Sequence, residues 1–270
     1  MKFSVLMSLY VREYPEYLNQ SLDSVFKQTL KADEVVLVED GLLTEQLNEV
    51  IQTYRVVHPE LKLVSLPING GLGNALNEGL KHCSHELVIR MDTDDICFPD
   101  RFEKQIEFMT KHPEVDISSA WLEEFEGDVT NVKTIKKVPA SHSEIKTYIK
   151  TRNPLNHPVV IFRKSAVERA GGYKHFPLFE DWYLWARMIQ SGARFANIQE
   201  CLLHFRTSSD MYKRRGGIKY AVDSAKFQWT LHKIGLISSY CAIKASLLRG
   251  GVYIMPNFMR RWIYSKLLRS

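Results

Sequence analysis

The chain contains few cysteines, and none of them lies close to another. Its 270 residues include four, Cys83, Cys97, Cys201 and Cys241, and no CxxC pair. Zinc sites and disulfide frameworks need closely spaced or paired thiols, so this pattern supports neither. Unpaired, scattered thiols are typical of a protein kept in a reducing cytoplasm.

Long apolar runs are also missing. No segment reaches the roughly 18 uninterrupted apolar residues that a membrane span requires. The apolar start, residues 3–10, is too short for a signal peptide and leads directly into Arg12 and Glu13. There is no internal repeat or low-complexity tract, and 45% hydrophobic with 25% charged residues is ordinary for a globular protein. The length allows one large domain, or one domain with an appendage.

Acidic residues are scarce in the last sixty positions. Residues 211–270 carry twelve Lys/Arg and one acid, Asp223, a charge of +11, so the net charge of +5 leaves −6 for residues 1–210. A basic tail on a mildly acidic body predicts contact with an anionic partner. Phosphates of nucleic acid and anionic lipid headgroups both meet this requirement.

In the first third, short apolar runs alternate with amphipathic segments. We expect strands at 3–9, 34–38, 62–66 and 86–91, and helices starting at Pro15 and spanning 44–57 and 72–83. This order predicts an α/β fold whose mostly parallel sheet is covered by helices on both faces. Ligands of such sheets bind beyond the carboxyl ends of the strands. The polar residues expected at those ends are Ser8, Tyr10, Glu39, Asp40, Asn69, Asp92 and Asp94.

The rest of the chain is less regular. We expect a helix after Pro99, a strand at 115–121, a strand-rich or irregular insertion ending in a helix over 122–150, a strand at 159–162, a helix at 164–170, a helix from 179 to 190, and strands at 194–198 and 201–206. A domain boundary is placed near residue 211. Basic helices with a break at Gly250-Gly251 are expected beyond it.

The fourth expected strand ends in three carboxylates. Residues 87–95 read Leu-Val-Ile-Arg-Met-Asp-Thr-Asp-Asp. Acidic side chains this close repel one another unless a metal or a cationic partner lies between them, and oxygen ligands suit a divalent cation. The alternative is a solvated turn that is acidic by accident.

The motifs together resemble family 2 glycosyltransferases with the GT-A fold. They are Val-Leu-Met-Ser-Leu-Tyr at 5–10, Val-Glu-Asp-Gly at 38–41, Asn-Gly-Gly-Leu-Gly-Asn-Ala-Leu-Asn at 69–77, Asp-Thr-Asp-Asp at 92–95 and Glu-Asp-Trp at 180–182. The resemblance covers about residues 3–206 and is strongest to the short bacterial enzymes of O-antigen, capsule and exopolysaccharide synthesis, such as those that make amylovoran. The chain departs from the family at Leu42, where a serine usually follows the glycine.

The resemblance implies inverting transfer from a nucleotide sugar, assisted by Mg²⁺ or Mn²⁺. Asp40 would lie beside the nucleotide base, with Tyr10 and Glu13 near the same pocket. Asp92 would face the ribose and the metal, and Asp94 would bind the metal. Among the other residues that would bind the donor we place Ser8, Asn69 and Arg90. Asp181 would be the general base, with Glu180 as the alternative.

Each assignment competes with a structural explanation. Asp181 precedes a helix, where an acid also satisfies free N–H groups and opposes the helix dipole. The glycines of 69–77 suit an anion-binding turn, but also close packing of a helix on the sheet. His157 is either a satisfied structural histidine or an acceptor contact. Trp182 and Trp185 fit the core, although Trp182 could stack on an acceptor sugar, and Arg206 could neutralise a diphosphate.

The tail suggests where the enzyme works. Residues 255–269 place Phe258, Met259, Trp262, Ile263 and Leu267 on roughly one half of a helix, among basic residues. We expect residues 211–270 to be a basic helical region attached to an anionic membrane surface. The alternative is a helical hairpin packed on the catalytic domain of residues 1–210.

The sequence therefore predicts a non-processive hexosyltransferase at the inner face of the cell membrane. It would transfer a hexose to a polyprenyl-diphosphate-linked saccharide, an intermediate of a bacterial surface polysaccharide. The resemblance to the family implies that the donor is a UDP-hexose. A Gln-x-x-Arg-Trp motif of processive synthases is absent. Alternatives are a nucleotidyltransferase, which would release pyrophosphate, and a catalytically silent protein that binds nucleotide sugar or nucleic acid. No binding motif for nucleic acid occurs in the body of the chain.

Overall fold

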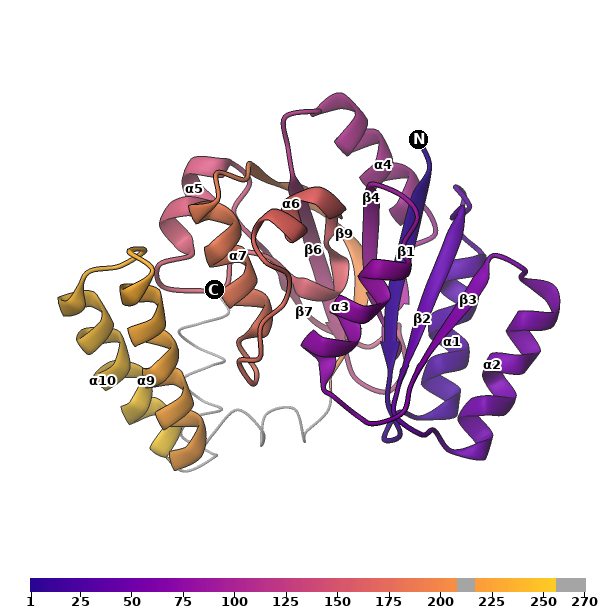
Figure 1. The fold of residues 1–270 in the computed structure, drawn as a ribbon, viewed down its shortest axis with the longest axis horizontal. Coiled ribbons are helices and arrows are strands. Elements are labelled where there is room, and N and C mark those ends of the chain that lie inside the picture. The colour runs from indigo at the N-terminus through magenta and orange to yellow at the C-terminus, as the bar shows by residue number, and fades with distance from the viewer. Residues whose placement is uncertain (208–216, 256–270) are drawn as a thin grey trace.

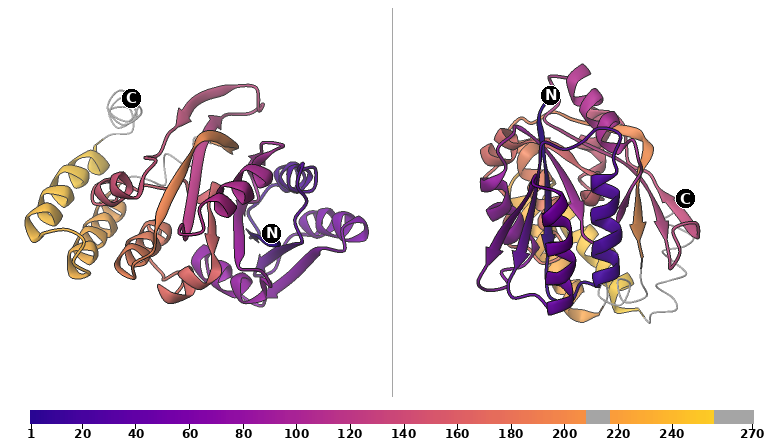
Figure 2. Two further views of the ribbon diagram at one scale, coloured as in Figure 1. Left: turned by 90° about the horizontal axis from the view of Figure 1, so that it is seen from above. Right: turned by 90° about the vertical axis from the view of Figure 1, so that its right-hand side faces the viewer.

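The computed structural model describes residues 1–207 and 217–255. In this part of the chain a nine-stranded sheet runs through the centre in the order β3-β2-β1-β4-β8-β6-β9-β5, with β7 paired to β6. Helices cover both faces of the sheet. Two further helices, α9 and α10, pack at the end of the molecule that is away from β3 (Figures 1 and 2).

The amino-terminal part is the expected succession of strands and helices. It consists of β1 (Phe3–Leu9), α1 (Pro15–Phe26), β2 (Glu34–Asp40), α2 (Glu45–Val57), β3 (Leu61–Leu66), α3 (Leu72–His82), β4 (Leu87–Asp92), β5 (Ile96–Cys97) and α4 (Arg101–Lys111). β1 pairs in parallel with both β2 and β4, and β2 pairs in parallel with β3. The predicted strands and helices are confirmed to within a few residues, and the two-residue strand β5 was not predicted.

The second part makes the sheet mixed. Its elements are β6 (Ile117–Phe125), β7 (Val132–Lys136), α5 (His142–Tyr148), a 3₁₀ turn (His157–Val159), β8 (Ile161–Arg163), α6 (Lys164–Arg169), α7 (Glu180–Gln190) and β9 (Phe195–Arg206). β8 pairs antiparallel with β4 and with β6, whereas β9 runs parallel to β6. The insertion predicted at 122–150 is the end of β6, its antiparallel partner β7 and helix α5.

Two apolar cores lie on opposite faces of the sheet. Successive residues of a strand point to opposite faces, so Leu6 joins the core under α3 and α7, while Val5 and Met7 join the core under α1, α2 and α4. Helix α3 packs closely on the sheet at Gly79. A Cβ added at Gly79 would lie 2.5 Å from side-chain atoms of Leu6 and Val38, so this approach requires glycine.

The described carboxyl-terminal residues form a helical hairpin, α9 (Ile218–Lys233) and α10 (Ser239–Ile254). The break predicted at Gly250-Gly251 is wrong, because α10 continues through both glycines. Packing against α9 outweighs the ~1 kcal/mol that each glycine costs in a helix. No described helix is long and apolar enough for a membrane crossing. The amphipathic helix predicted at 255–269 lies outside the described residues except for Met255, and the boundary near 211 also lies outside them.

Candidate active site

The carboxyl ends of β1, β2 and β4 meet at one edge of the sheet. Ser8 of β1 is opposite Val38 of β2 on one side and opposite Asp92 of β4 on the other. Because the three strands are parallel, the residues that follow them gather at this edge. The pairing of these strands therefore places the predicted residues Ser8, Asp40 and Asp92 at the same edge of the sheet.

Three carboxylates follow β4 closely. Asp92, Asp94 and Asp95 each offer an oxygen within 4.8 Å of the others. Asp95 is fully buried; one of its oxygens accepts a bond from the Arg206 amide at 2.8 Å, and the other has no hydrogen-bond partner among the described residues. A buried oxygen left in this state is costly unless something positive binds it.

The electrostatics of the three carboxylates fit a divalent cation. Burial, followed by the repulsion of Asp92, raises the pKa of Asp94 to about 7. Burial and the neighbouring carboxylates also raise the pKa of Asp95 well above its usual value. Hard oxygen ligands with an uncompensated negative charge are the donor set that Mg²⁺ and Mn²⁺ prefer. The group could hold such an ion through Asp92, Asp94 and Asp95.

Arg90 holds Asp92 from behind. The guanidinium is 2% exposed, and its two terminal nitrogens donate to the two oxygens of Asp92, one of them at 2.7 Å. We predicted Arg90 as a contact to the donor. In the structure its two terminal nitrogens donate to Asp92 and fix the orientation of that carboxylate, and the contact to the donor stays a prediction.

Helix α1 and strand β9 close the carboxylate loop on its outer side. Glu13 accepts from Thr93 at 3.1 Å, and burial raises its pKa. Arg206 donates to the backbone oxygen of Asp94 at 2.8 Å and lies 3.9 Å from the ring centre of Tyr17. The predicted residue Tyr10 is 38% exposed at the rim.

Asp40 binds the glycine-rich turn that precedes α3. Its two carboxylate oxygens accept from the amides of Gly70 at 2.7 Å and Gly71 at 3.0 Å, and Asn69 donates to its backbone oxygen. The two amides that a ligand anion would use are thus bonded to the chain's own Asp40, and a role of the turn in binding a ligand anion stays a prediction. Gly41 has φ +86°, and a Cβ there would lie 2.8 Å from the Asn69 nitrogen.

Asp181 lies in the first turn of α7 and is held on both oxygens. One accepts from Asn153 at 2.6 Å, and the other from the Trp182 amide at 2.6 Å. These bonds lower the pKa of Asp181, but burial raises it by more. Phe179 occupies the N-cap position of α7 without a side-chain capping bond, and the bond from the Trp182 amide lets Asp181 satisfy one free N–H group of the first turn, as the structural alternative has it. Burial also raises the pKa of the neighbouring Glu180 to about 7, with Asp181 adding to the rise.

Two buried side chains, Arg90 and Tyr173, interact electrostatically with both sets of carboxylates. The charge of Arg90 lowers the pKa of Asp94 on one side and of Asp181 on the other, against the larger effect of burial. Burial raises the pKa of Tyr173, and the charges of Asp181 and Asp92 act on it in the same direction. His157 bonds the Tyr173 hydroxyl at 2.8 Å. His157 is therefore a satisfied buried histidine, the structural alternative at that position.

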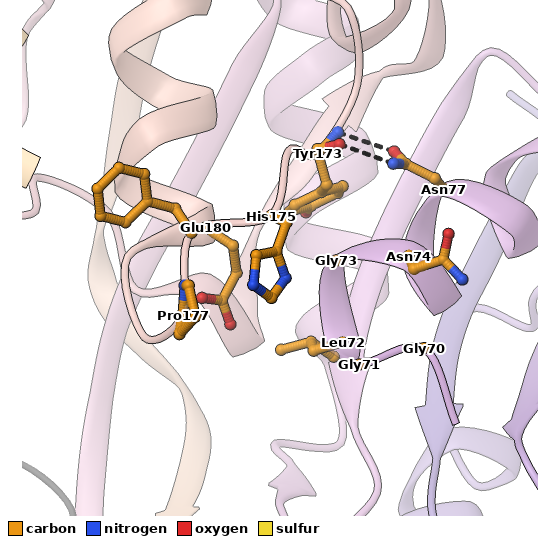
Figure 3. A pocket seen from close by; sticks show the side chains of 11 residues that line it. Gly70, Gly71, Leu72, Gly73, Asn74, Asn77, Tyr173, His175, Pro177 and Glu180 are labelled. Carbon is orange, nitrogen blue, oxygen red and sulfur yellow. Dashed lines mark hydrogen bonds between the residues drawn. The ribbon is translucent and has the colours of Figure 1, made fainter. Parts of the chain in front are cut away.

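A cavity of about 290 Å³ opens between the glycine-rich turn and α7 (Figure 3). The wall from the turn and α3 is Gly70, Gly71, Leu72, Gly73, Asn74 and Asn77, and the opposite wall is Tyr173, His175, Phe176, Pro177 and Glu180. One Glu180 oxygen is buried without a hydrogen-bond partner among the described residues. Two bonds of 2.7 Å between the Asn77 amide and the backbone of Tyr173 tie the walls together.

Four of these residues were missed by the sequence analysis. Asn77 lies beside the buried positions of α3 and closes the quoted motif 69–77, which was the signal that could have revealed it. Tyr173 and His175 follow the helix predicted at 164–170, and Asn153 lies between two predicted elements, so none of the three was assigned a role. Trp182 and Trp185 are 5% and 0% exposed, so their assignment to the core is confirmed.

Known proteins with the same architecture were found by sequence and by structure. The sequence model described as "Glycosyl transferase family 2" matches residues 4–170. The chain is 43% identical to an Escherichia coli "UDP-Gal:alpha-D-GlcNAc-diphosphoundecaprenol beta-1,3-galactosyltransferase", over 99% of this chain and 97% of that one. It is 42% identical to the amylovoran biosynthesis glycosyltransferase AmsE of Erwinia amylovora, over 98% of both chains.

A solved structure shares the fold at low sequence identity. The mannosyltransferase PcManGT of Pyrobaculum calidifontis, solved with GDP-Man and Mn²⁺, superposes with a TM-score of 0.64 at 16% identity, covering 98% of this chain and 80% of that one. The predicted GT-A fold is thereby confirmed.

Proposed function

Because the chain belongs to glycosyl transferase family 2, we propose that it transfers a hexose from a UDP-hexose to a polyprenyl-diphosphate-linked saccharide, inverting the anomeric centre. The product would be an intermediate of a bacterial surface polysaccharide. The relatives support this reading: the E. coli enzyme is named for UDP-Gal and a diphosphoundecaprenol acceptor, and AmsE for an exopolysaccharide. Both are matched along nearly their whole length.

One observation carries the proposal. Two groups of carboxylates, Asp94 with Asp95 and Glu180 with Asp181, have pKa values raised by burial, and the charge of Arg90 acts on both groups. Paired carboxylate groups with separate environments are the arrangement in which one group serves charge stabilisation and the other proton transfer. Inverting transfer needs this division, because the leaving group and the attacking hydroxyl are on opposite faces of the sugar.

The acidic loop would serve the leaving group. Asp94, with Asp92 and Asp95 beside it, would hold Mg²⁺ or Mn²⁺, which when bound supplies Lewis-acid stabilisation to the diphosphate. Arg90 keeps the carboxylate of Asp92 in place. Ser8, Tyr10, Glu13, Asp40 and Asn69 would surround the nucleoside at the same edge of the sheet, and the cavity beside Glu180 would take the hexose.

Asp181 would take the proton of the acceptor hydroxyl. Asn153 and the Trp182 amide hold its two oxygens, which leaves the remaining lone pairs for the incoming hydroxyl. Burial raises its pKa above that of an ordinary aspartate, which makes the carboxylate a stronger base. Glu180 is the alternative base. Its raised pKa and unpartnered oxygen also suit a hydrogen bond to a sugar hydroxyl.

The proposal also covers where the enzyme works. A polyprenyl-linked acceptor resides in the membrane, so we propose that the protein acts as a peripheral protein on the cytoplasmic face, with residues 211–270 as its membrane-association region and residues 1–210 as its catalytic domain. The basic excess of residues 211–270 supports this. Nucleic acid is not expected as a partner.

The first test is Asp181→Asn, with Glu180→Gln as the matched neighbour. A general base contributes about 10²–10⁴-fold, so we expect Asp181→Asn to lower kcat by that factor while the Kd for UDP-hexose, measured by calorimetry with Mn²⁺, stays within about threefold. A screen of UDP-Glc, UDP-Gal and UDP-GlcNAc with a GlcNAc-diphospholipid would identify the donor. Equal loss of binding and turnover in Asp181→Asn contradicts the base assignment, and release of pyrophosphate would establish a nucleotidyltransferase.

A further inference from the structure

One face of α9 exposes apolar side chains in a row. Ile218, Val222 and Trp229 are 72%, 47% and 45% exposed. They are separated by four and seven residues, which is close to one and two helical turns, so the three side chains lie on the same face. The opposite side of α9 is buried through Phe227 and Leu231. The apolar row is therefore not the packing face of the helix.

A row of lysines runs beside the apolar row. The row consists of residues seven positions apart, Lys219, Lys226 and Lys233. This spacing is close to two helical turns, so the three lysines lie along one side of the helix, next to the apolar row. All three are exposed. We call these six residues, Ile218, Val222, Trp229, Lys219, Lys226 and Lys233, the α9 face.

The second helix of the hairpin has the same character. α10 exposes Tyr240, Ile243, Leu247 and Leu248 by 55–72% and contains no acidic residue. Among the described residues 217–255 the one acid is Asp223, whose carboxylate lies 3.8 Å from the Lys226 ammonium. The same stretch also contains the basic residues Lys244 and Arg249. Aromatic, aliphatic and lysine side chains mixed on one surface, with almost no acids, are typical of a helix in the headgroup layer of a bilayer.

We propose that the α9 face docks on the anionic surface of a phospholipid bilayer, with Trp229 at headgroup level. This rests on the proposed function, since a lipid-linked acceptor requires a membrane partner. Charge complementarity selects the occupant: lysines attract anionic headgroups, while a second copy of the chain would bring like-charged rows together across a twofold interface. The apolar row adds burial that a polyanion in water would not use.

The docked surface is connected to the catalytic helix. Phe227 of α9 stacks on Phe179 and packs on Trp182, with ring centres 4.7 and 4.9 Å apart. The amide of Trp182 donates to Asp181. Figure 1 shows α9 beside α7, with α10 outside it. Docking through α9 would thus bring the proposed base close to the membrane, where the acceptor's diphosphate is.

The test is vesicle binding in the absence of any transferase substrate. The full-length protein is sedimented with vesicles of phosphatidylglycerol and phosphatidylethanolamine, and with vesicles of phosphatidylcholine alone. A lysine near an anionic surface contributes about fivefold in partitioning, so we expect the triple variant Lys219→Gln, Lys226→Gln, Lys233→Gln to bind the anionic vesicles on the order of 100-fold more weakly. Wild type should prefer the anionic vesicles strongly.

The matched control removes the same charge elsewhere. Lys27, Lys81 and Lys111 are exposed at the carboxyl ends of α1, α3 and α4. The triple glutamine variant at these positions should bind the vesicles within about threefold of wild type, since only the net charge has changed. Equal weakening in both triple variants would overturn the α9 face as the docking site.

Tryptophan quenching by brominated lipid locates the contact. In a chain that also carries Trp262→Phe, the change Trp229→Phe should retain vesicle binding but lose a large part of the quenching, because Trp182 and Trp185 are buried and Trp121 lies in β6 with Lys137 over its ring. Unchanged quenching, or a dimer in solution that the triple α9 variant abolishes, would overturn the proposal. Turnover with a short-chain, water-soluble acceptor tests the proposed function separately: the α9 variant should keep it, so a failure of docking and a failure of the transferase assignment are distinguishable.

Discussion

At the scale of single residues, the site is a set of carboxylates whose ionised form is made unfavourable by burial. Asp94 and Glu180 both have a pKa raised to about 7 by burial, and Asp181 and Glu13 are raised as well. Arg90 offsets part of this cost by pairing with Asp92. An ionised site of this kind is destabilising on its own and gains stability from a bound cation.

This cost predicts how the stability changes with pH. In the folded protein Asp94 keeps its proton up to about pH 7, whereas in the unfolded chain it loses it near its ordinary value of 3.8. The folded state therefore binds more protons between these values, and its stability falls as the pH rises through this window. Without metal at pH 8, Asp94→Asn should melt a few degrees higher than wild type, at ~2–4 °C per kcal/mol.

Metal addition supplies the control for that prediction. Mn²⁺ at pH 8 should raise the melting temperature of wild type and leave that of Asp94→Asn nearly unchanged, as differential scanning fluorimetry would report. A variant that gains as much from Mn²⁺ as wild type does would remove Asp94 from the proposed metal ligands. Lowering the pH to 5 should shrink the difference between the two metal-free proteins, because Asp94 is then protonated.

At the scale of secondary structure, helix α3 shows which sequence features were sufficient. Its apolar positions Ala75, Leu76 and Leu80 gave both the helix and its buried face. What they did not give is how near the helix lies to the sheet. That distance is set by Gly79, whose missing side chain lets Leu6 and Val38 contact the helix.

Two glycines in helices should therefore respond to alanine in opposite ways. Gly79→Ala places a methyl group 2.5 Å from Leu6 and Val38 and should destabilise the protein by about 1–3 kcal/mol through overpacking. Gly250→Ala meets open space in α10 and should stabilise it by up to ~1 kcal/mol. Urea unfolding measures both. Destabilisation by Gly250→Ala would contradict the straight course of α10 through this residue.

At the scale of the whole molecule, the carboxyl-terminal hairpin is joined to the catalytic helix. Arg249 of α10 lies 5.1 Å from the ring centre of Trp182 and donates to the backbone oxygen of Thr151. Trp182 and Asn153, two residues beyond Thr151, provide the two bonds that hold Asp181. The hairpin thus supports both sides of the proposed base. This contact agrees with the alternative that the carboxyl-terminal region packs on the catalytic domain.

We expect Arg249→Gln to act on kcat rather than on KM for the donor. Loss of the contact should loosen Asp181 and lower kcat about tenfold, since small displacements of a catalytic group cost rate. Arg249→Lys should recover part of it, because a lysine keeps the charge over the ring but not the planar guanidinium. Steady-state kinetics with a soluble acceptor would measure this, and an unchanged kcat in Arg249→Gln would show that the hairpin does not position the base.

The sequence by itself determined the alternation of strands and helices, the edge at which the ligand residues gather, and the carboxylates Asp92 and Asp94 at that edge. These follow from local periodicity and from the rule that parallel strands end at one edge, whereas Asp181 was implied by the resemblance to family 2 glycosyltransferases. Only the tertiary structure decided that β8 turns the sheet antiparallel, that Arg90 binds Asp92, that Asp40 holds the glycine-rich turn and that Arg249 supports the base. These contacts join residues from different strands and helices, or depend on how deeply a side chain is buried, and neither is recorded in the spacing of residues along the chain.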